Sequence, residues 1–132
     1  MSIVVGYLAT VEGRAALTAA TDEAVRRAET LVVVVSERGD ETDEQKSELA
    51  TALDEVRTSL EERGVPHDVR VVSGGRDVAE TLIGTAEETG ASLMVIGLRR
   101  RSPVGKLILG ANAQRILLDS PCPVLAVKPD PS

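Results

Sequence analysis

The sequence predicts an α/β protein, with a parallel sheet covered by helices on both faces. The reason is that short apolar runs typical of strands alternate along the chain with longer segments that carry helix signals. Five short runs are rich in β-branched residues and mostly continuously apolar, which is typical of strands buried on both faces. These runs are residues 3–6, 31–36, 69–73, 93–97 and 124–128. No linker or internal repeat interrupts the alternation, so residues 1–132 are expected to form one domain.

Three of the intervening segments carry clear helix signals. Residues 11–28 are rich in Ala, Leu, Val and Arg and contain no proline. The next helix is expected to start near Thr42 and to stop at Gly64. Its apolar side chains form one stripe at helical spacing, namely Leu49, Leu53, Val56 and Leu60. The third helix is expected between Asp77 and Gly90.

The segment 106–119 is the fourth helix candidate, and it contains a glycine at Gly110. A start at Ser102 and Pro103 is one interpretation, because these residues suit a cap and a first helical turn. The interpretation that we favour is a long helix that starts after Gly110, with a turn or a short helix before it.

Composition narrows the class of partner. The net charge of −6 disfavours nucleic acid and anionic membranes, and Tyr7 is the only aromatic residue, so platforms for stacking bases are missing. No apolar stretch approaches the roughly 20 residues that cross a bilayer. The single cysteine, Cys122, cannot form an internal disulfide. We expect a soluble, cytoplasmic protein with neither nucleic acid nor membrane as partner.

One segment departs from this acidic background. Residues 97–112 contain three arginines, one lysine and no acidic residue, between glycines. The segment follows the fourth expected strand, and ligands of parallel sheets bind beyond the carboxyl ends of strands. Backbone N–H groups and arginines together suit phosphate oxygens. A phosphate-bearing ligand is the direct interpretation, and a solvated basic loop is the alternative.

Established phosphate and catalytic motifs are absent from the sequence. A Walker A loop read back from Lys106 would place Leu107 where Ser or Thr must hold Mg²⁺. No G-x-G-x-x-G follows the first strand. No paired carboxylates lie in the basic loop, so the sequence gives little support to an enzyme that hydrolyses a phosphate ligand, and no catalytic residue is assigned. His67 has no neighbouring His or Cys, and no metal site is expected.

The whole chain resembles the universal stress protein family. The nucleotide-binding members of that family carry G-x2-G-x9-G-[ST] between the fourth strand and the last helix. Gly97 fits the first position and Gly110 the last glycine, whereas Arg100 replaces the middle glycine and Ala111 the Ser or Thr. The phrases RSPVGKLILG and AQRILLDSPCPVLAVK are also similar to the family. The resemblance implies a three-layer α/β/α sandwich of the adenine nucleotide alpha hydrolase type, with strand order 3-2-1-4-5.

The resemblance also implies a nucleotide site. It puts adenine near the end of the second strand and phosphates over Gly97, Gly110 and Asn112, where arginines can reach phosphate oxygens. The implied binding residues are Val35, Ser36, Ile96, Gly97, Arg99, Arg100, Ser102, Lys106, Gly110, Ala111 and Asn112. ATP-binding members usually carry an Asp after the first strand, but Tyr7, Leu8 and Ala9 offer no carboxylate, and Glu12 lies further along.

The function that the resemblance implies is a regulatory domain of the stress response that binds ATP or AMP, with Mg²⁺ accompanying ATP, and acts as a homodimer. The last strand of family members commonly pairs with its counterpart in a second subunit. A short apolar strand at a sheet edge also invites such pairing. The expected interface residues are Val124, Leu125, Ala126 and Val127. The alternative is a dimeric interaction module that binds no nucleotide.

Overall fold

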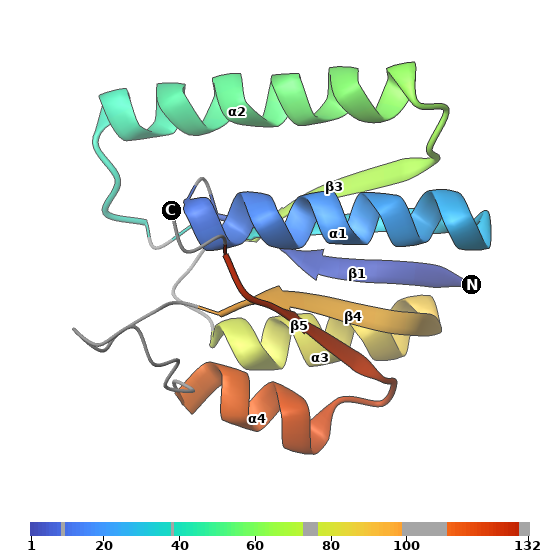
Figure 1. The fold of residues 1–132 in the computed structure, drawn as a ribbon. Helices are drawn as coiled ribbons and strands as arrows, with labels where there is room; N and C mark the ends of the chain where they lie inside the picture. Colours follow the sequence, from blue (N-terminus) through green and yellow to red (C-terminus); the bar gives the residue numbers. More distant parts are fainter. Residues whose placement is uncertain (9, 38, 73–76, 99–110, 130–132) are drawn as a thin grey trace.

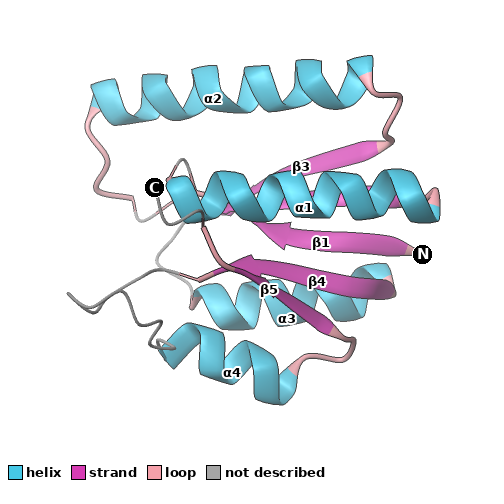
Figure 2. Cartoon of the chain, viewed as in Figure 1, coloured by secondary structure: helices cyan, strands magenta, loops and turns pink. Residues whose placement is uncertain are grey.

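The computed structural model describes residues 1–8, 10–37, 39–72, 77–98 and 111–129. These residues form one parallel sheet in the order β3-β2-β1-β4-β5, between two layers of helices (Figures 1 and 2). The strands are β1 (Ser2–Gly6), β2 (Thr30–Ser36), β3 (His67–Val72), β4 (Ala91–Gly97) and β5 (Val124–Val127). The helices are α1 (Val11–Arg27), α2 (Asp43–Glu62), α3 (Val78–Thr89) and α4 (Ala111–Asp119). The predicted α/β/α fold and strand order are confirmed.

Two hydrophobic cores lie on opposite faces of the sheet. Ile3 and Val5 of β1 face a core that α1 and α2 cover, and Val4 between them faces a core that α3 and α4 cover. Because successive strand residues point to opposite faces, a strand between two cores needs apolar residues at consecutive positions. This arrangement explains the continuous apolar runs of β1, β2 and β4, whereas the edge strand β3 also carries Asp68 and Arg70.

The ends of the helices are fixed by local hydrogen bonds. Thr42 and Gln45 form a reciprocal pair at the start of α2, in which each side chain accepts a hydrogen bond from the backbone of the other. Asp77 caps α3 by accepting from two backbone N–H groups. Gly90 ends α3 in the left-handed conformation, with a φ of 63°. These residues include both boundaries that the sequence predicted for α3.

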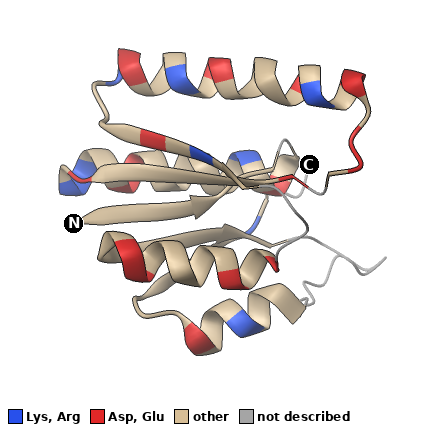
Figure 3. Ribbon diagram, turned by 180° about the vertical axis from the view of Figure 1, so that it is seen from behind, with Lys and Arg blue, Asp and Glu red and all other residues tan. Residues whose placement is uncertain are grey.

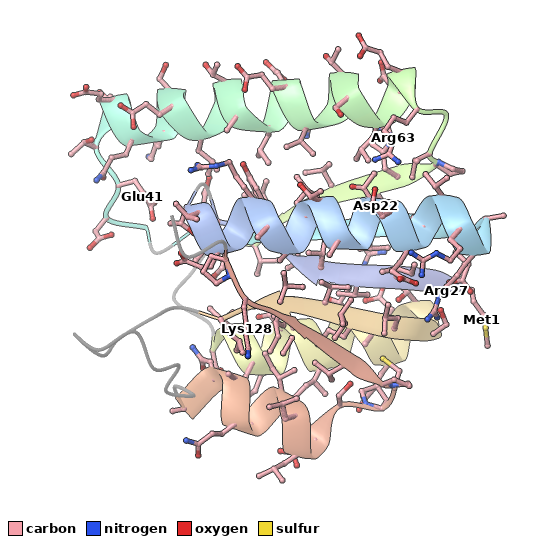
Figure 4. All side chains as sticks on the ribbon, viewed as in Figure 1. Met1, Asp22, Arg27, Glu41, Arg63 and Lys128 are labelled. Atoms are coloured by element: carbon pink, nitrogen blue, oxygen red, sulfur yellow. The ribbon has the colours of Figure 1, made fainter. Side chains whose placement is uncertain are left out.

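Basic and acidic residues both occur along α1, α2 and α4, whereas the charged residues of α3 are all acidic (Figure 3). One exposed ion pair joins α1 to the end of α2, where Nη1 of Arg63 lies 3.2 Å from Oδ1 of Asp22 (Figure 4). An exposed pair of this kind contributes about 0–1 kcal/mol. The buried leucines and valines under α2 therefore hold this helix in place more firmly than its charges do.

Candidate functional site

A pocket of about 490 Å³ opens at the carboxyl ends of β1, β2 and β4. Gly6, Ser36 and Gly97, which are the last residues of these three strands, all line it. From β1 the chain continues to β2 on one side, whereas β4 pairs with β1 on the other side. The strand order therefore reverses between β1 and β4, which is where open parallel sheets bind their ligands.

The walls of the pocket are mainly apolar. Val34, Leu82, Ile96 and Ile116 are buried side chains that line it from β2, α3, β4 and α4. Polar groups are supplied by a second set of lining residues, namely Glu12, Ser36, Thr81 and Asn112. An apolar cavity with a few converging polar groups suits a small organic ligand that has an apolar ring and a polar part. Among the described lining residues, none is Lys or Arg.

Gly97 has a packing reason to be glycine. A Cβ added at this position would overlap the carbonyl oxygen of Glu12, in the first turn of α1. The end of β4 therefore touches the backbone of α1 directly, and any side chain at position 97 would push the two elements apart. The sequence interpretation assigned Gly97 to a phosphate cradle, and this close approach is a second demand on the same residue.

The structure brings five of the predicted nucleotide-binding residues into the lining of the pocket, namely Ser36, Ile96, Gly97, Ala111 and Asn112. Val35 points instead into the core under α1 and α2, because it alternates with Val34 and Ser36 along β2. The remaining predicted residues lie outside the described part of the chain: Arg99, Arg100, Ser102, Lys106 and Gly110.

Sequence reasoning missed several lining residues. Glu12 lines the pocket although the sequence interpretation set it aside as lying too far along the chain. It does so because Thr10 caps α1 through the Gly13 N–H, which brings the first helical turn over the strand ends. The pairing of a Thr cap with an acidic first turn was the signal that could have located it. Nothing in the sequence marks Thr81 of α3 as a neighbour of this site.

Tyr7 is the only aromatic residue of the chain, and it lines the pocket while its ring is buried. Burial raises the pKa of its phenol above the usual 10.0, with a smaller opposing effect from the positive charge of Arg14. Its backbone N–H donates to the carbonyl oxygen of Val34 at 2.9 Å, which extends the β1–β2 ladder to the mouth of the pocket.

An ion-pair network joins the two helices that flank the pocket. Arg115 of α4 donates to Oδ2 of Asp77 at 2.9 Å and to Oε1 of Glu80 at 3.0 Å. The hydrogen bond to Glu80 is the main reason why the pKa of Arg115 is raised above its usual value. Asp77 precedes α3 and Glu80 lies in its first turn, so the network links α4 to the start of α3.

The predicted interface strand, β5, lies at an edge of the described sheet, where it pairs only with β4. Val124 and Ala126 pack against the core under α3 and α4, and Val127 packs against the opposite core. Leu125 is 38% exposed. The carbonyl oxygen of Val127 accepts a hydrogen bond from the Leu98 N–H at 2.9 Å. The end of β5 is therefore bonded to the residue that directly follows β4.

The described residues offer no group of three or more His, Cys, Asp and Glu side chains that could hold a metal ion. Nδ1 of His67 lies 2.9 Å from the carbonyl oxygen of Val65. Cys122 is half-buried and its Sγ lies 3.6 Å from Oγ of Ser120, in the turn before β5. Within the described ranges, no helix is both long enough and apolar enough to span a membrane.

The fold and the site together therefore define the class of protein: a three-layer α/β protein with a pocket at the switch point of its parallel sheet. The universal stress protein family model matches residues 1–128. A universal stress protein of Mycolicibacterium smegmatis is 43% identical over 127 residues, which cover 96% of this chain and 97% of that protein. The chain belongs to the universal stress protein family.

Solved structures share the fold. The structure of a universal stress protein from Archaeoglobus fulgidus has a TM-score of 0.78 and 29% identity, and the match covers 96% of this chain and 97% of that one. The structure of the universal stress protein from the same organism in complex with dAMP has a TM-score of 0.74 and 24% identity, and the match covers 96% of both chains.

Proposed function

We propose that the chain binds an adenine nucleotide, AMP or ATP, in the pocket at the carboxyl ends of β1, β2 and β4. The observation that carries this proposal is the pocket itself, about 490 Å³ in volume, mainly apolar, and located at the switch point of a parallel sheet. A fold shared with a protein that was solved in complex with dAMP supports adenine as the base.

The proposed contacts divide between two parts of the site. The apolar walls at Val34, Leu82 and Ile96 suit the flat face of a base, and Ser36 and Asn112 offer hydrogen bonds to its edge or to the sugar. Three arginines and a lysine follow β4 in the sequence, and the proposal gives them the role of neutralising the phosphates. These residues are Arg99, Arg100, Arg101 and Lys106. Mg²⁺ would arrive with ATP, coordinated by its phosphate oxygens.

Thermal unfolding tests the proposal. A ligand that binds only the folded state raises the free energy of unfolding by about 2.7 kcal/mol at a concentration of 100 Kd. The unfolding midpoint is expected to rise by several degrees with millimolar AMP or Mg-ATP. No rise with either nucleotide would favour the second candidate, an interaction module without nucleotide.

A matched pair of variants locates the ligand. Ala111 is exposed and lines the pocket at the start of α4, so Ala111→Trp places an indole ring in the site. Ala50 is exposed on α2 and lies outside the pocket lining, so Ala50→Trp adds the same side chain elsewhere. The first variant is expected to lose the nucleotide-induced rise and the second to keep it. Equal behaviour of the two variants would count against this pocket.

The wider role that we propose is regulatory. We infer that the chain works as a cytoplasmic homodimer in a stress response, with β5 pairing against its counterpart in a second subunit. Membership of the universal stress protein family supports the stress role. The edge position of β5 and the exposure of Leu125 support pairing.

A further inference from the structure

The last helix, α4, has few apolar side chains that pack on the rest of the fold. Ile116 is the buried residue of α4, and this nine-residue helix leaves Leu117 and Leu118 exposed. Ile116 and the partly buried Ala113 are the apolar side chains that pack α4 on the core, so this contact is narrow. A second connection is needed to fix α4, and α4 lines the pocket with Ala111, Asn112, Ala113 and Ile116.

Arg115, the neighbour of Ile116, supplies that connection. Its two Nη groups donate to two different carboxylates across the helix interface, and its Nε lies 3.9 Å from Asp119 on its own helix. Exposed single ion pairs contribute little, but a planar guanidinium that binds two carboxylates fixes direction as well as distance. The orientation of α4 is thereby tied to two points on α3, Asp77 and Glu80.

Asp77 has two roles, because it caps α3, which lines the pocket, and also binds Arg115 of α4. Its Oδ1 accepts from the N–H of Ala79 at 2.8 Å and so caps α3, while its Oδ2 accepts from Arg115. Val78 and Thr81, next to the two carboxylate residues, line the pocket from α3. The same carboxylate therefore sets the start of one wall and holds the helix that forms another.

We propose that Arg115 is a positioning residue that sets the separation of α3 and α4 and thereby the width of the nucleotide pocket, without touching the ligand. This inference rests on the proposed nucleotide site. Removing the guanidinium leaves Ile116 packed but frees α4 to shift, so the ligand loses contacts on one wall while the two cores stay intact.

The test compares Arg115 with Arg70, because each of these arginines binds two carboxylates. Arg115→Met removes the pocket network and keeps an unbranched side chain. Arg70→Met removes a matched network, in which Arg70 of β3 donates to Asp68 at 2.8 Å and to Glu88 at 3.4 Å on the far end of α3. None of these control residues lines the pocket. Arg115→Lys is the conservative variant, because an ammonium group lacks the planar fork.

Three quantities are measured for each variant: the AMP dissociation constant by calorimetry, the amide hydrogen exchange of residues 113–119, and the midpoint of urea unfolding. For Arg115→Met we expect AMP binding to weaken about fivefold or more and exchange in α4 to accelerate, with a urea midpoint like that of Arg70→Met. Arg115→Lys is expected to lie between Arg115→Met and the wild type. Unchanged AMP affinity in Arg115→Met would overturn the inference.

The failure of the nucleotide proposal has a different signature. If the wild-type chain itself binds neither AMP nor Mg-ATP, the nucleotide function fails, and hydrogen exchange alone decides the positioning role. Faster exchange in α4 of Arg115→Met, but not of Arg70→Met, would then support that role. Equal exchange in the two variants would refute it, because α4 would be held without the arginine.

Discussion

Gly97 at the end of β4 lies directly against the backbone of Glu12 in the first turn of α1, so closely that a Cβ at position 97 would overlap the Glu12 carbonyl. Both residues line the pocket. This contact joins two segments that are far apart in the sequence and holds the start of α1 against the end of β4.

Gly97→Ala is expected to destabilise the fold by about 1–3 kcal/mol, because the added methyl group meets backbone atoms that cannot turn aside. Gly84→Ala is the control, since Gly84 lies in α3 with no atom within 4 Å of an added Cβ. The control should gain about 0.5–1 kcal/mol. Urea denaturation measures both, and equal stability of the two variants would show that the contact is not rigid.

Leu31→Ala is expected to cost about 2–5 kcal/mol, because Leu31 is fully buried in the core under α1 and α2 and its removal leaves a cavity. Leu118 of α4 is 83% exposed, and Leu118→Ala should change the free energy of unfolding by less than about 0.5 kcal/mol. The same denaturation experiment compares them. A small loss at Leu31 would contradict the two-core description.

The raised pKa of Tyr7 predicts a loss of stability at high pH. Below pH 10.0 the phenol is protonated in both states and adds no pH dependence. Above pH 10.0 the unfolded chain ionises first, so the free energy of unfolding falls as pH rises, until the folded pKa is passed. Comparison with Tyr7→Phe isolates this fall from the titration of other groups.

Because Tyr7 is the only aromatic residue, phenolate absorbance reports its titration directly. A native titration at or below pH 10.0 would refute the shift.

The proposed homodimer predicts a mass of twice 13.9 kDa by light scattering at micromolar concentration. Leu125→Arg places a charge on the edge strand β5 and is expected to give the monomer mass. Leu118→Arg places the same charge on exposed α4 and should leave the dimer intact. A wild-type mass of 13.9 kDa would exclude pairing at this concentration.

The sequence predicted the elements well, because their signals are local. Apolar β-branched runs located every strand, and Thr42 and Gly64 marked the limits of α2 to within two residues. The side of the sheet to which each strand residue points was harder to predict. Residues 31–35 are all apolar, so the sequence has no alternation to indicate that Val34 lines the pocket while Val35 faces the other core.

The candidate site was predictable only in part, for a related reason. Ser36, Gly97 and Asn112 lie in segments that carry recognisable motifs or strand ends. Leu82 and Ile116 reach the same cavity from the middle of amphipathic helices, where they look like any other core residue. Their place in the pocket depends on how α3 and α4 pack on the sheet, which is a property of the tertiary fold.

The central claim is that an adenine nucleotide binds at the switch point of the sheet, and a two-dimensional amide spectrum titrated with AMP tests it most directly. We predict saturable shifts at Gly6, Ser36, Gly97 and Asn112, which line the pocket. A shallow depression on α2, lined by residues that include Thr51 and Glu62, serves as the internal reference and should stay unshifted. Shifts confined to α2, or no shifts with either AMP or Mg-ATP at millimolar concentration, would contradict the claim.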